Sequence, residues 1–169
     1  SAASDVYKRQ DYLSGVAFYL GVDDRCYEVD ILYTQDPMEL TEPATAHMIL
    51  KNRIDRVFIE SNNGGRGFAR KVEEILRNYG WEGEIEAFTQ SLNKEARILT
   101  NKTTVNTSII FKEGWIEEHP AFASSVLSFK KLFKANKHDD APDTLTGCVE
   151  KSGIIDYAFY ENESLGDVN

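Results

Sequence analysis

Cysteine, tryptophan and methionine are scarce in this 169-residue sequence, and positive charge is in deficit. The two cysteines, Cys26 and Cys148, are too few for a disulfide framework and lack the spacing of a zinc site, which favours a reducing compartment. Lys and Arg number 19 against 28 Asp and Glu, so the formal net charge is -9. This balance argues against a generally basic nucleic-acid coat, although local charge governs each contact with nucleic acid.

Long apolar runs are also lacking. The longest, at residues 16–20, is far shorter than the roughly 20 residues that a helix needs to span a bilayer. No secretory signal pattern opens the chain. We therefore expect no membrane role and a protein that is cytoplasmic rather than secreted. The length predicts about one domain with a sizeable core.

The two ends of the chain differ in character from the middle. Residues 1–10, "SAASDVYKRQ", have no clear hydrophobic period and resemble adapter read-through, so we expect them to be non-native. Residues 151–169 form an acidic C-terminal extension that we expect to be partly disordered. The interpretable sequence is therefore residues 11–150.

Hydrophobic periodicity in this middle part predicts strands that alternate with helices. Residues 13–20 and 26–33 read as a hairpin, and Thr41 is expected to cap the next helix. The remaining expected elements are strands at 56–60, 83–88 and 108–115 and helices at 68–79, 93–106, 119–134 and 144–150. An antiparallel pair followed by alternating strands and helices predicts an α/β fold with a mixed sheet flanked by helices.

Glu60 stands out because it ends an apolar strand and precedes "SNNGGRGFARK". Ligands of open α/β sheets bind beyond the carboxyl ends of strands, and the glycines of this turn permit positive φ and close approach of the backbone to a ligand. The turn lacks the spacing of a phosphate-binding P-loop. A structural role for Glu60, as a helix cap or a solvated strand end, is equally compatible with the local sequence.

A second acidic motif is "HDDAPD", in which His138 precedes Asp139 and Asp140. Acids before a helix interact favourably with its positive end, so a structural role is open here too. Adjacent carboxylates resist joint ionisation unless a cation is present. Together with Glu60 they could hold Mg²⁺ or Mn²⁺, and two such ions about 4 Å apart suit phosphodiester cleavage.

Basic residues lie near both acidic motifs in the sequence. Taken singly, each group is more often a solvated helix face. Taken together in an acidic chain, they indicate a local track for phosphates. The candidates for DNA contact are Arg66, Arg70, Lys94 and Arg97, and a further group comprises Lys130, Lys131, Lys134 and Lys137.

With these motifs in place, residues 11–150 resemble the nuclease domain of the large terminase subunit of tailed bacteriophages. The matching segments, in the family's order, are "DYLSGVAFYLG", "IESNNGGRGFARKVE", "NKEARI" and "HDDAPDTLTG". The resemblance implies an RNase H-like mixed β-sheet with helices on both faces. It also implies an endonuclease in the bacterial cytoplasm that uses two Mg²⁺ or Mn²⁺ ions to cut concatemeric double-stranded DNA during genome packaging.

The resemblance assigns the acids by position. Glu60 resembles the family's second metal-binding carboxylate, and Asp140, with Asp139 beside it, resembles the third. The family's first Asp would fall inside residues 1–10, where Asp5 is the only acid. The implied partners are double-stranded DNA, the portal protein and the small terminase subunit.

Three alternatives remain open from the sequence. One is a catalytically inactive module of the same fold that binds DNA or contacts the packaging motor, which is favoured because the first Asp would fall inside residues 1–10. The second is a different RNase H-like nuclease, such as a junction resolvase. The third is a soluble α/β domain with capped helices and solvated charges.

Overall fold

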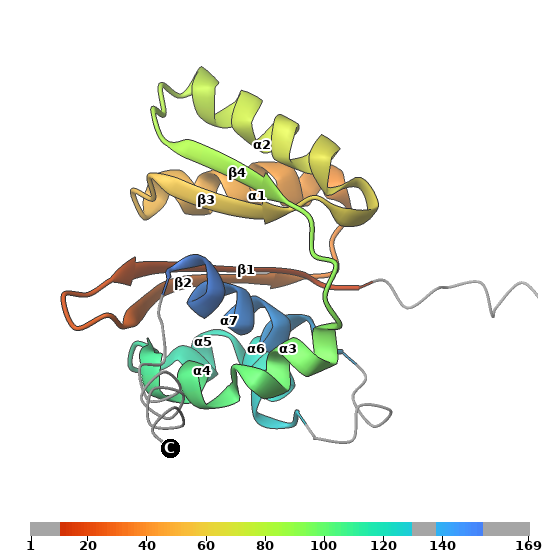
Figure 1. The fold of residues 1–169 in the computed structure, drawn as a ribbon. Helices are drawn as coiled ribbons and strands as arrows, with labels where there is room; N and C mark the ends of the chain where they lie inside the picture. Colours follow the sequence, from red (N-terminus) through yellow and green to blue (C-terminus); the bar gives the residue numbers. More distant parts are fainter. Residues whose placement is uncertain (1–10, 130–137, 154–169) are drawn as a thin grey trace, which may run out of the picture.

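The computed structural model describes residues 11–129 and 138–153 (Figure 1). Its strands are β1 (Leu13–Leu20), β2 (Cys26–Thr34), β3 (Arg56–Glu60), β4 (Glu84–Phe88) and β5 (Ile109–Ile110). Its helices are α1 (Met38–Lys51), the 3-10 turn η1 (Asn62–Gly64), α2 (Gly65–Asn78), α3 (Lys94–Thr100), α4 (Lys102–Ser108), α5 (Trp115–Glu118), α6 (Pro120–Leu127) and α7 (Asp140–Lys151). Asp5 and the lysines at 130, 131, 134 and 137 lie outside the described residues, as does the extension from residue 154.

The strands pair in both directions, as the sequence predicts for a mixed α/β arrangement. β1 and β2 form the antiparallel hairpin, and β5 adds to β2 in parallel. β3 and β4 form a parallel pair, with Glu60 opposite Phe88. The described strands are divided between two sheets, β1-β2-β5 and β3-β4, and do not form one continuous sheet.

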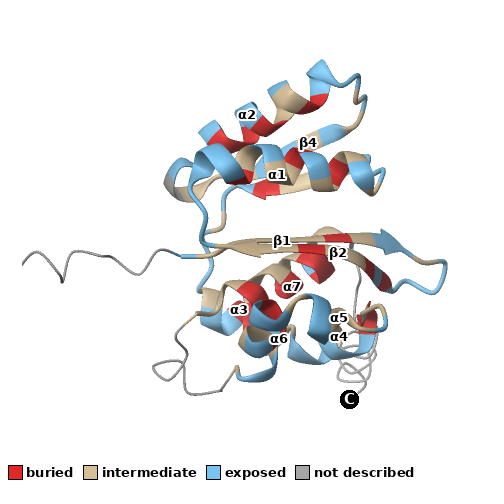
Figure 2. Cartoon of the chain, turned by 180° about the vertical axis from the view of Figure 1, so that it is seen from behind, coloured by how far each residue is buried: buried red, intermediate tan, exposed pale blue. Residues whose placement is uncertain are grey.

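Helices lie on both sides of the strands, and each sheet has its own apolar core (Figures 1 and 2). Helices α1 and α2 lie on the side of β3 and β4, and the core there includes Ile49, Val72 and Leu76. Helices α3 to α7 lie on the far side of the β1-β2 hairpin, where Phe122 and Leu145 are almost completely buried. Because α7 contacts β1 and α1 also contacts β1, the hairpin lies between the two groups of helices.

Helix α2 follows directly from its sequence pattern. Phe68, Val72 and Leu76 recur every four residues and are buried, while the opposite face is charged. The helix ends at Asn78, and Gly80 then adopts a positive φ of 77°, a conformation that favours glycine. This strand, turn and helix unit carries Glu60 at its centre.

Several helix predictions were wrong in their boundaries, among them the helix expected at 119–134, since α6 ends at Leu127. Helix α1 begins at Met38, because Pro37 has the extended backbone of a position just outside a helix, so Thr41 lies within the helix and is no cap. The single helix expected at 93–106 is broken at Asn101, whose side-chain amide donates to the carbonyl of Arg97 over 2.9 Å. Helix α7 begins at Asp140, four residues before the expected start.

The strand expected at residues 108–115 is also shorter than predicted, since only Ile109 and Ile110 pair with β2.

Among the described residues no helix is long and apolar enough to cross a membrane.

Glu28 on β2 is a buried acid whose charge works against folding. Its side chain is 3% exposed, one carboxylate oxygen accepts from the Lys112 backbone N–H over 3.2 Å, and the other has no hydrogen-bond partner among the described residues. Burial raises the pKa of Glu28 above its ordinary value, although Lys112 opposes the shift. The ionised carboxylate is therefore less favourable in the folded protein than in the unfolded chain.

We expect Glu28→Gln to raise the free energy of unfolding by about 1 kcal/mol at pH 7. A raised pKa means that wild type loses stability as pH rises through the pKa of the folded state. The advantage of the variant should therefore vanish near pH 4, where the wild-type carboxyl group is protonated. Urea unfolding at both pH values measures the difference in free energy of unfolding between the variant and wild type. Glu117→Gln, at an exposed position, is the control. A variant that is no more stable than wild type at pH 7 would contradict this reading.

Candidate functional site

Glu60 lies at the carboxyl end of β3, where the loops after the two parallel strands meet. The Ser61 backbone N–H donates to the carbonyl of Phe88 at the end of β4 over 2.7 Å. The side-chain amide of Asn62 donates to Glu60 Oε1 over 2.7 Å and to the carbonyl of Gln90 over 2.9 Å. Glu60 itself is exposed. The loop therefore holds the carboxylate of Glu60 in place while leaving it open to solvent.

The glycines after Glu60 have distinct roles. Gly64 has a φ of 97°, which favours glycine. A Cβ on Gly65 would lie 2.0 Å from the carbonyl oxygen of Glu60, so only glycine lets helix α2 begin this close to the strand end. Gly67 has open space around the Cβ position. The close approach at Gly65 is thus to the protein's own backbone, and it places the start of α2 directly beside Glu60.

The second group of acids lies at the beginning of α7. Asp139 immediately precedes the helix, and Asp140 and Asp143 lie in its first turn, where the helix dipole favours negative charge. Asp140 Oδ2 accepts a hydrogen bond of 3.1 Å from the backbone N–H of Tyr12, just before β1. This contact fixes Asp140 at the end of the hairpin where the chain enters β1.

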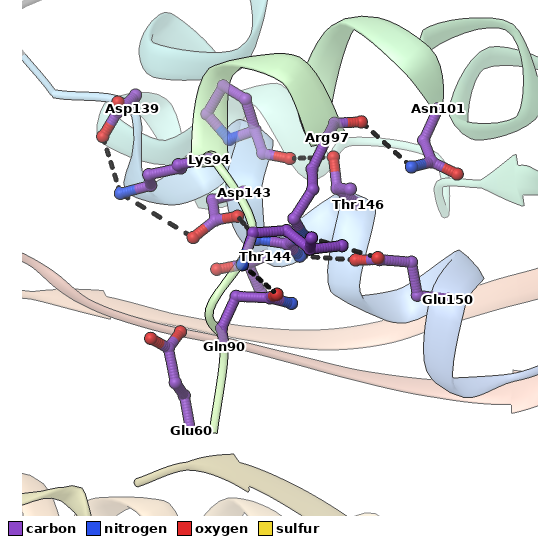
Figure 3. Close-up of polar contacts among 12 residues, drawn as sticks. Glu60, Gln90, Lys94, Arg97, Asn101, Asp139, Asp143, Thr144, Thr146 and Glu150 are labelled. Atoms are coloured by element: carbon purple, nitrogen blue, oxygen red, sulfur yellow. Dashed lines mark hydrogen bonds and ion pairs between the residues drawn. The ribbon is translucent and has the colours of Figure 1, made fainter. Parts of the chain in front are cut away.

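Lys94, the first residue of α3, lies among these acids (Figure 3). Its Nζ is 2.7 Å from Asp139 Oδ1, 3.2 Å from Asp140 Oδ1 and 3.7 Å from Asp143 Oδ2. Burial alone would lower the pKa of Lys94, but the hydrogen bond to Asp139 and the charge of Asp140 raise it above its ordinary value. The ammonium group is therefore held firmly in its charged form.

Arg97 lies one turn further along α3 and is buried, with 7% of its surface exposed. Its guanidinium donates to Asp143 Oδ1 over 2.8 Å and forms a second ion pair with Glu150. A buried guanidinium committed to two carboxylates has little surface for a DNA phosphate. The structure thus favours a positioning role for Arg97 over the DNA contact that the sequence predicts.

The electrostatics link Glu60 to the acids of α7. Burial raises the pKa of Asp143, and the negative charge of Glu60 raises it further, against the opposing charges of Lys94 and Arg97. In Figure 3 the carboxylate of Glu60 points toward this group of side chains. Residues from β3 and from the start of α7, far apart in sequence, thus lie at one end of the fold.

Asp143 is the acid that the sequence analysis missed. It follows Asp140 by three residues, and residues three apart lie on the same face of a helix. That spacing could have identified it, had the helix been predicted to begin at Asp140. We define Asp139, Asp140 and Asp143 as the α7 acid cluster.

The other predicted residues are divided between the surface and the site. Arg66 and Arg70 are exposed and lie one turn apart on α2, close in sequence to Glu60. The ring of His138 packs edge-on against the ring of Tyr12, with 5.0 Å between centroids. Lys94 lies within the α7 acid cluster and is about one-third exposed.

Carboxylate oxygens are the donors that Mg²⁺ and Mn²⁺ prefer, so the chemistry of this site fits a divalent cation. Their arrangement differs from a formed metal site. In residues 11–129 and 138–153, no three His, Cys, Asp or Glu side chains are placed so that they could hold one metal ion. The α7 acid cluster instead surrounds the ammonium of Lys94.

Comparison with known protein families identifies a match. Residues 21–108, more than half of the chain, match the family described as Terminase Bacteriophage T7, Ribonuclease H-like domain. The matched segment contains Glu60, Lys94 and Arg97, and the α7 acid cluster follows it. A search of curated proteins found no match. The chain therefore belongs to the family of RNase H-like domains of bacteriophage terminases, which are domains of the nuclease type.

Proposed function

We propose that this domain is a metal-dependent endonuclease of a terminase large subunit that cuts concatemeric double-stranded DNA during genome packaging. Family membership supports a nuclease-type terminase domain. The observation that carries the proposal is the placement of Glu60 on the side of the fold where the α7 acid cluster lies, with its charge acting on Asp143. Acids converging from a strand end and a helix start are what phosphodiester cleavage with divalent cations needs.

In this proposal Glu60, Asp139 and Asp140 hold Mg²⁺ or Mn²⁺, with Asp143 as a further carboxylate. Two such ions would activate a water molecule and stabilise the leaving oxygen of the DNA backbone. Asn62 orients Glu60 through its hydrogen bond of 2.7 Å, and Arg97 holds Asp143 in place. These two residues position the acids without touching DNA.

The DNA itself would lie along the exposed side of α2. Arg66 and Arg70 present two cations near the Glu60 end of the helix, and phosphates are the groups that such side chains bind without reading sequence. The chain as a whole has a net charge of -9, which repels DNA. The attraction to DNA phosphates would therefore come from these local cations. By family, the portal protein and the small terminase subunit are the proposed protein partners.

A second candidate is an inactive module that binds DNA or the packaging motor. The observation that favours it is the ammonium of Lys94 among the α7 acids, in a structure whose described residues contain no preformed three-acid metal group. Such a module would still bind DNA in a salt-dependent manner, because phosphate contacts release counterions.

Incubation of the 169-residue chain with supercoiled plasmid tests the proposal. We expect nicked and linear products with Mn²⁺ and none with EDTA, together with Mn²⁺ binding measured by calorimetry. Cleavage of linear duplex at least as fast as of a branched junction would support a packaging nuclease over a resolvase. A chain that binds no Mn²⁺ and leaves the plasmid intact would contradict the nuclease proposal.

A further inference from the structure

The position of Lys94 is unusual for a lysine near the surface. Three carboxylates, of Asp139, Asp140 and Asp143, approach its Nζ at 2.7, 3.2 and 3.7 Å. Figure 3 labels Asp139 and Asp143 beside Lys94. A typical exposed ion pair joins one cation to one acid and contributes little, because solvent screens it and both side chains lose freedom. Here one cation contacts all three carboxylates of the α7 acid cluster and offsets part of their charge.

The local fold delivers Lys94 to this place. Asn93 caps helix α3 by accepting from the backbone N–H of Ala96 over 2.9 Å, so the helix begins at Lys94. One turn later, Arg97 and Ile98 are buried, and Arg97 ties α3 to α7 through Asp143 and Glu150. The stem of Lys94 is therefore anchored by a helix packed against the one that bears the acids.

Electrostatics explain why a cation is needed there. Three carboxylates grouped at the start of one helix repel each other, and the helix dipole offsets only part of that repulsion. In the described structure the nearest positive charges to these acids are on Lys94 and Arg97. Arg97 Nη1 contacts Asp143, whereas Lys94 contacts all three acids, so one oxygen of each carboxylate is engaged by the ammonium.

We propose that Lys94 is a built-in competitor of the divalent cation: its ammonium occupies the α7 acid cluster in the metal-free domain and must withdraw when a metal ion binds. This inference rests on the proposed function, because it concerns the same carboxylates. It makes Lys94 a regulator of metal loading and assigns it a role other than permanent DNA contact. One-third exposure leaves the ammonium a route to solvent when it is displaced.

The test is the affinity of the full chain for Mn²⁺, measured by calorimetry. Lys94→Met keeps most of the side-chain volume and removes the charge, so we expect the dissociation constant to fall about tenfold, since a strong but partly screened competitor is lost. Lys94→Arg keeps the charge and should stay within about threefold of wild type. Lys71→Met, which removes an exposed lysine paired with Glu74, is the matched control and should leave the affinity unchanged.

A structural reading of Lys94 predicts a different result. If the ion pairs only stabilise the fold, Lys94→Met should bind Mn²⁺ as wild type does or more weakly, and either outcome overturns the inference. Thermal unfolding adds a second readout: metal-free Lys94→Met should melt below wild type, and saturating Mn²⁺ should raise its Tm by more than it raises that of wild type. An equal rise in Tm for Lys94→Met and for wild type would also overturn the inference.

A measurement on the wild-type chain avoids any failure of the variants to fold. In a Mg²⁺ titration followed by NMR of isotope-labelled lysine, the Lys94 Cε and Nζ signals should move in step with binding, while those of Lys71 stay fixed. Suppose that Asp140→Asn abolishes Mg²⁺ binding, but the Lys94 signals of the wild-type chain do not move during the titration. The proposal that Lys94 competes with the cation is then wrong, and the nuclease proposal stands. If wild type binds neither Mg²⁺ nor Mn²⁺, both proposals fail.

Discussion

Replacing Glu60 with Gln is expected to reduce Mn²⁺-supported DNA cleavage by about 10²–10³-fold, since a divalent ion is worth several kcal/mol of charge stabilisation. Gln has nearly the same shape and keeps an oxygen that can accept from Asn62, the contact that measures 2.7 Å to Glu60 Oε1. The substitution therefore removes the negative charge while preserving the loop. Plasmid nicking rates with Mn²⁺ measure the effect, and the Mn²⁺ dissociation constant should rise in parallel.

The matched control is Glu86→Gln on the neighbouring strand β4. Glu86 is exposed and pairs with Arg56 at 3.8 Å. Its replacement should leave cleavage within about twofold of wild type. DNA binding by Glu60→Gln should also persist, because Arg66 and Arg70 are untouched. Undiminished cleavage by Glu60→Gln would remove Glu60 from the site, and salt-dependent DNA binding with no cleavage in wild type would favour the inactive module.

Replacing Arg97 with Met is expected to lower the free energy of unfolding by about 3–5 kcal/mol, the usual cost of breaking a buried ion pair. Arg97 is 7% exposed, and its guanidinium pairs with both Asp143 and Glu150. Met fills much of the same volume, so the loss comes mainly from Glu150, which loses its ion pair with Arg97, and from Asp143, which keeps only the longer contact to Lys94. Urea unfolding followed by circular dichroism measures this loss in the free energy of unfolding.

Two further variants isolate the cause. Arg56→Met removes an exposed pair and should cost less than about 1 kcal/mol. Adding Asp143→Asn and Glu150→Gln to Arg97→Met should restore part of the lost stability, because the unpaired charges disappear. A loss for Arg97→Met as small as that for Arg56→Met would show that the pairs with Asp143 and Glu150 contribute little.

The local elements with a strong hydrophobic period were predictable from sequence. The hairpin, the strand ending at Glu60 and helix α2 all appear as expected, because alternation with period 2 and recurrence every three or four residues are set by the geometry of one element. The predicted ends of helices were wrong where a single neighbouring residue set the end of the helix. Pro37 moved the start of α1 to Met38, and the amide of Asn101 interrupted the helix predicted across 93–106.

The candidate site was predictable only in part. The sequence shows the type of each residue and its position in a strand or helix, but it does not show which side chains from different elements form contacts. Glu60, Asp139 and Asp140 were named from their strand end and helix start, and they remain proposed metal ligands. The burial of Arg97 and the place of Lys94 could not be read from the sequence. Both follow from the packing of α3 against α7, two helices about 45 residues apart in the chain.

The sequence by itself therefore determined most of the segments that become strands and helices, the α/β class, and the resemblance that the family match confirmed. These depend on patterns within short windows and on the order of motifs along the chain. Only the tertiary structure decided that the strands divide into two sheets and that Asp143 joins the acids. It alone placed a lysine at the position between carboxylates where a metal ion was expected, because a charge finds its partner through packing between elements that the sequence keeps far apart.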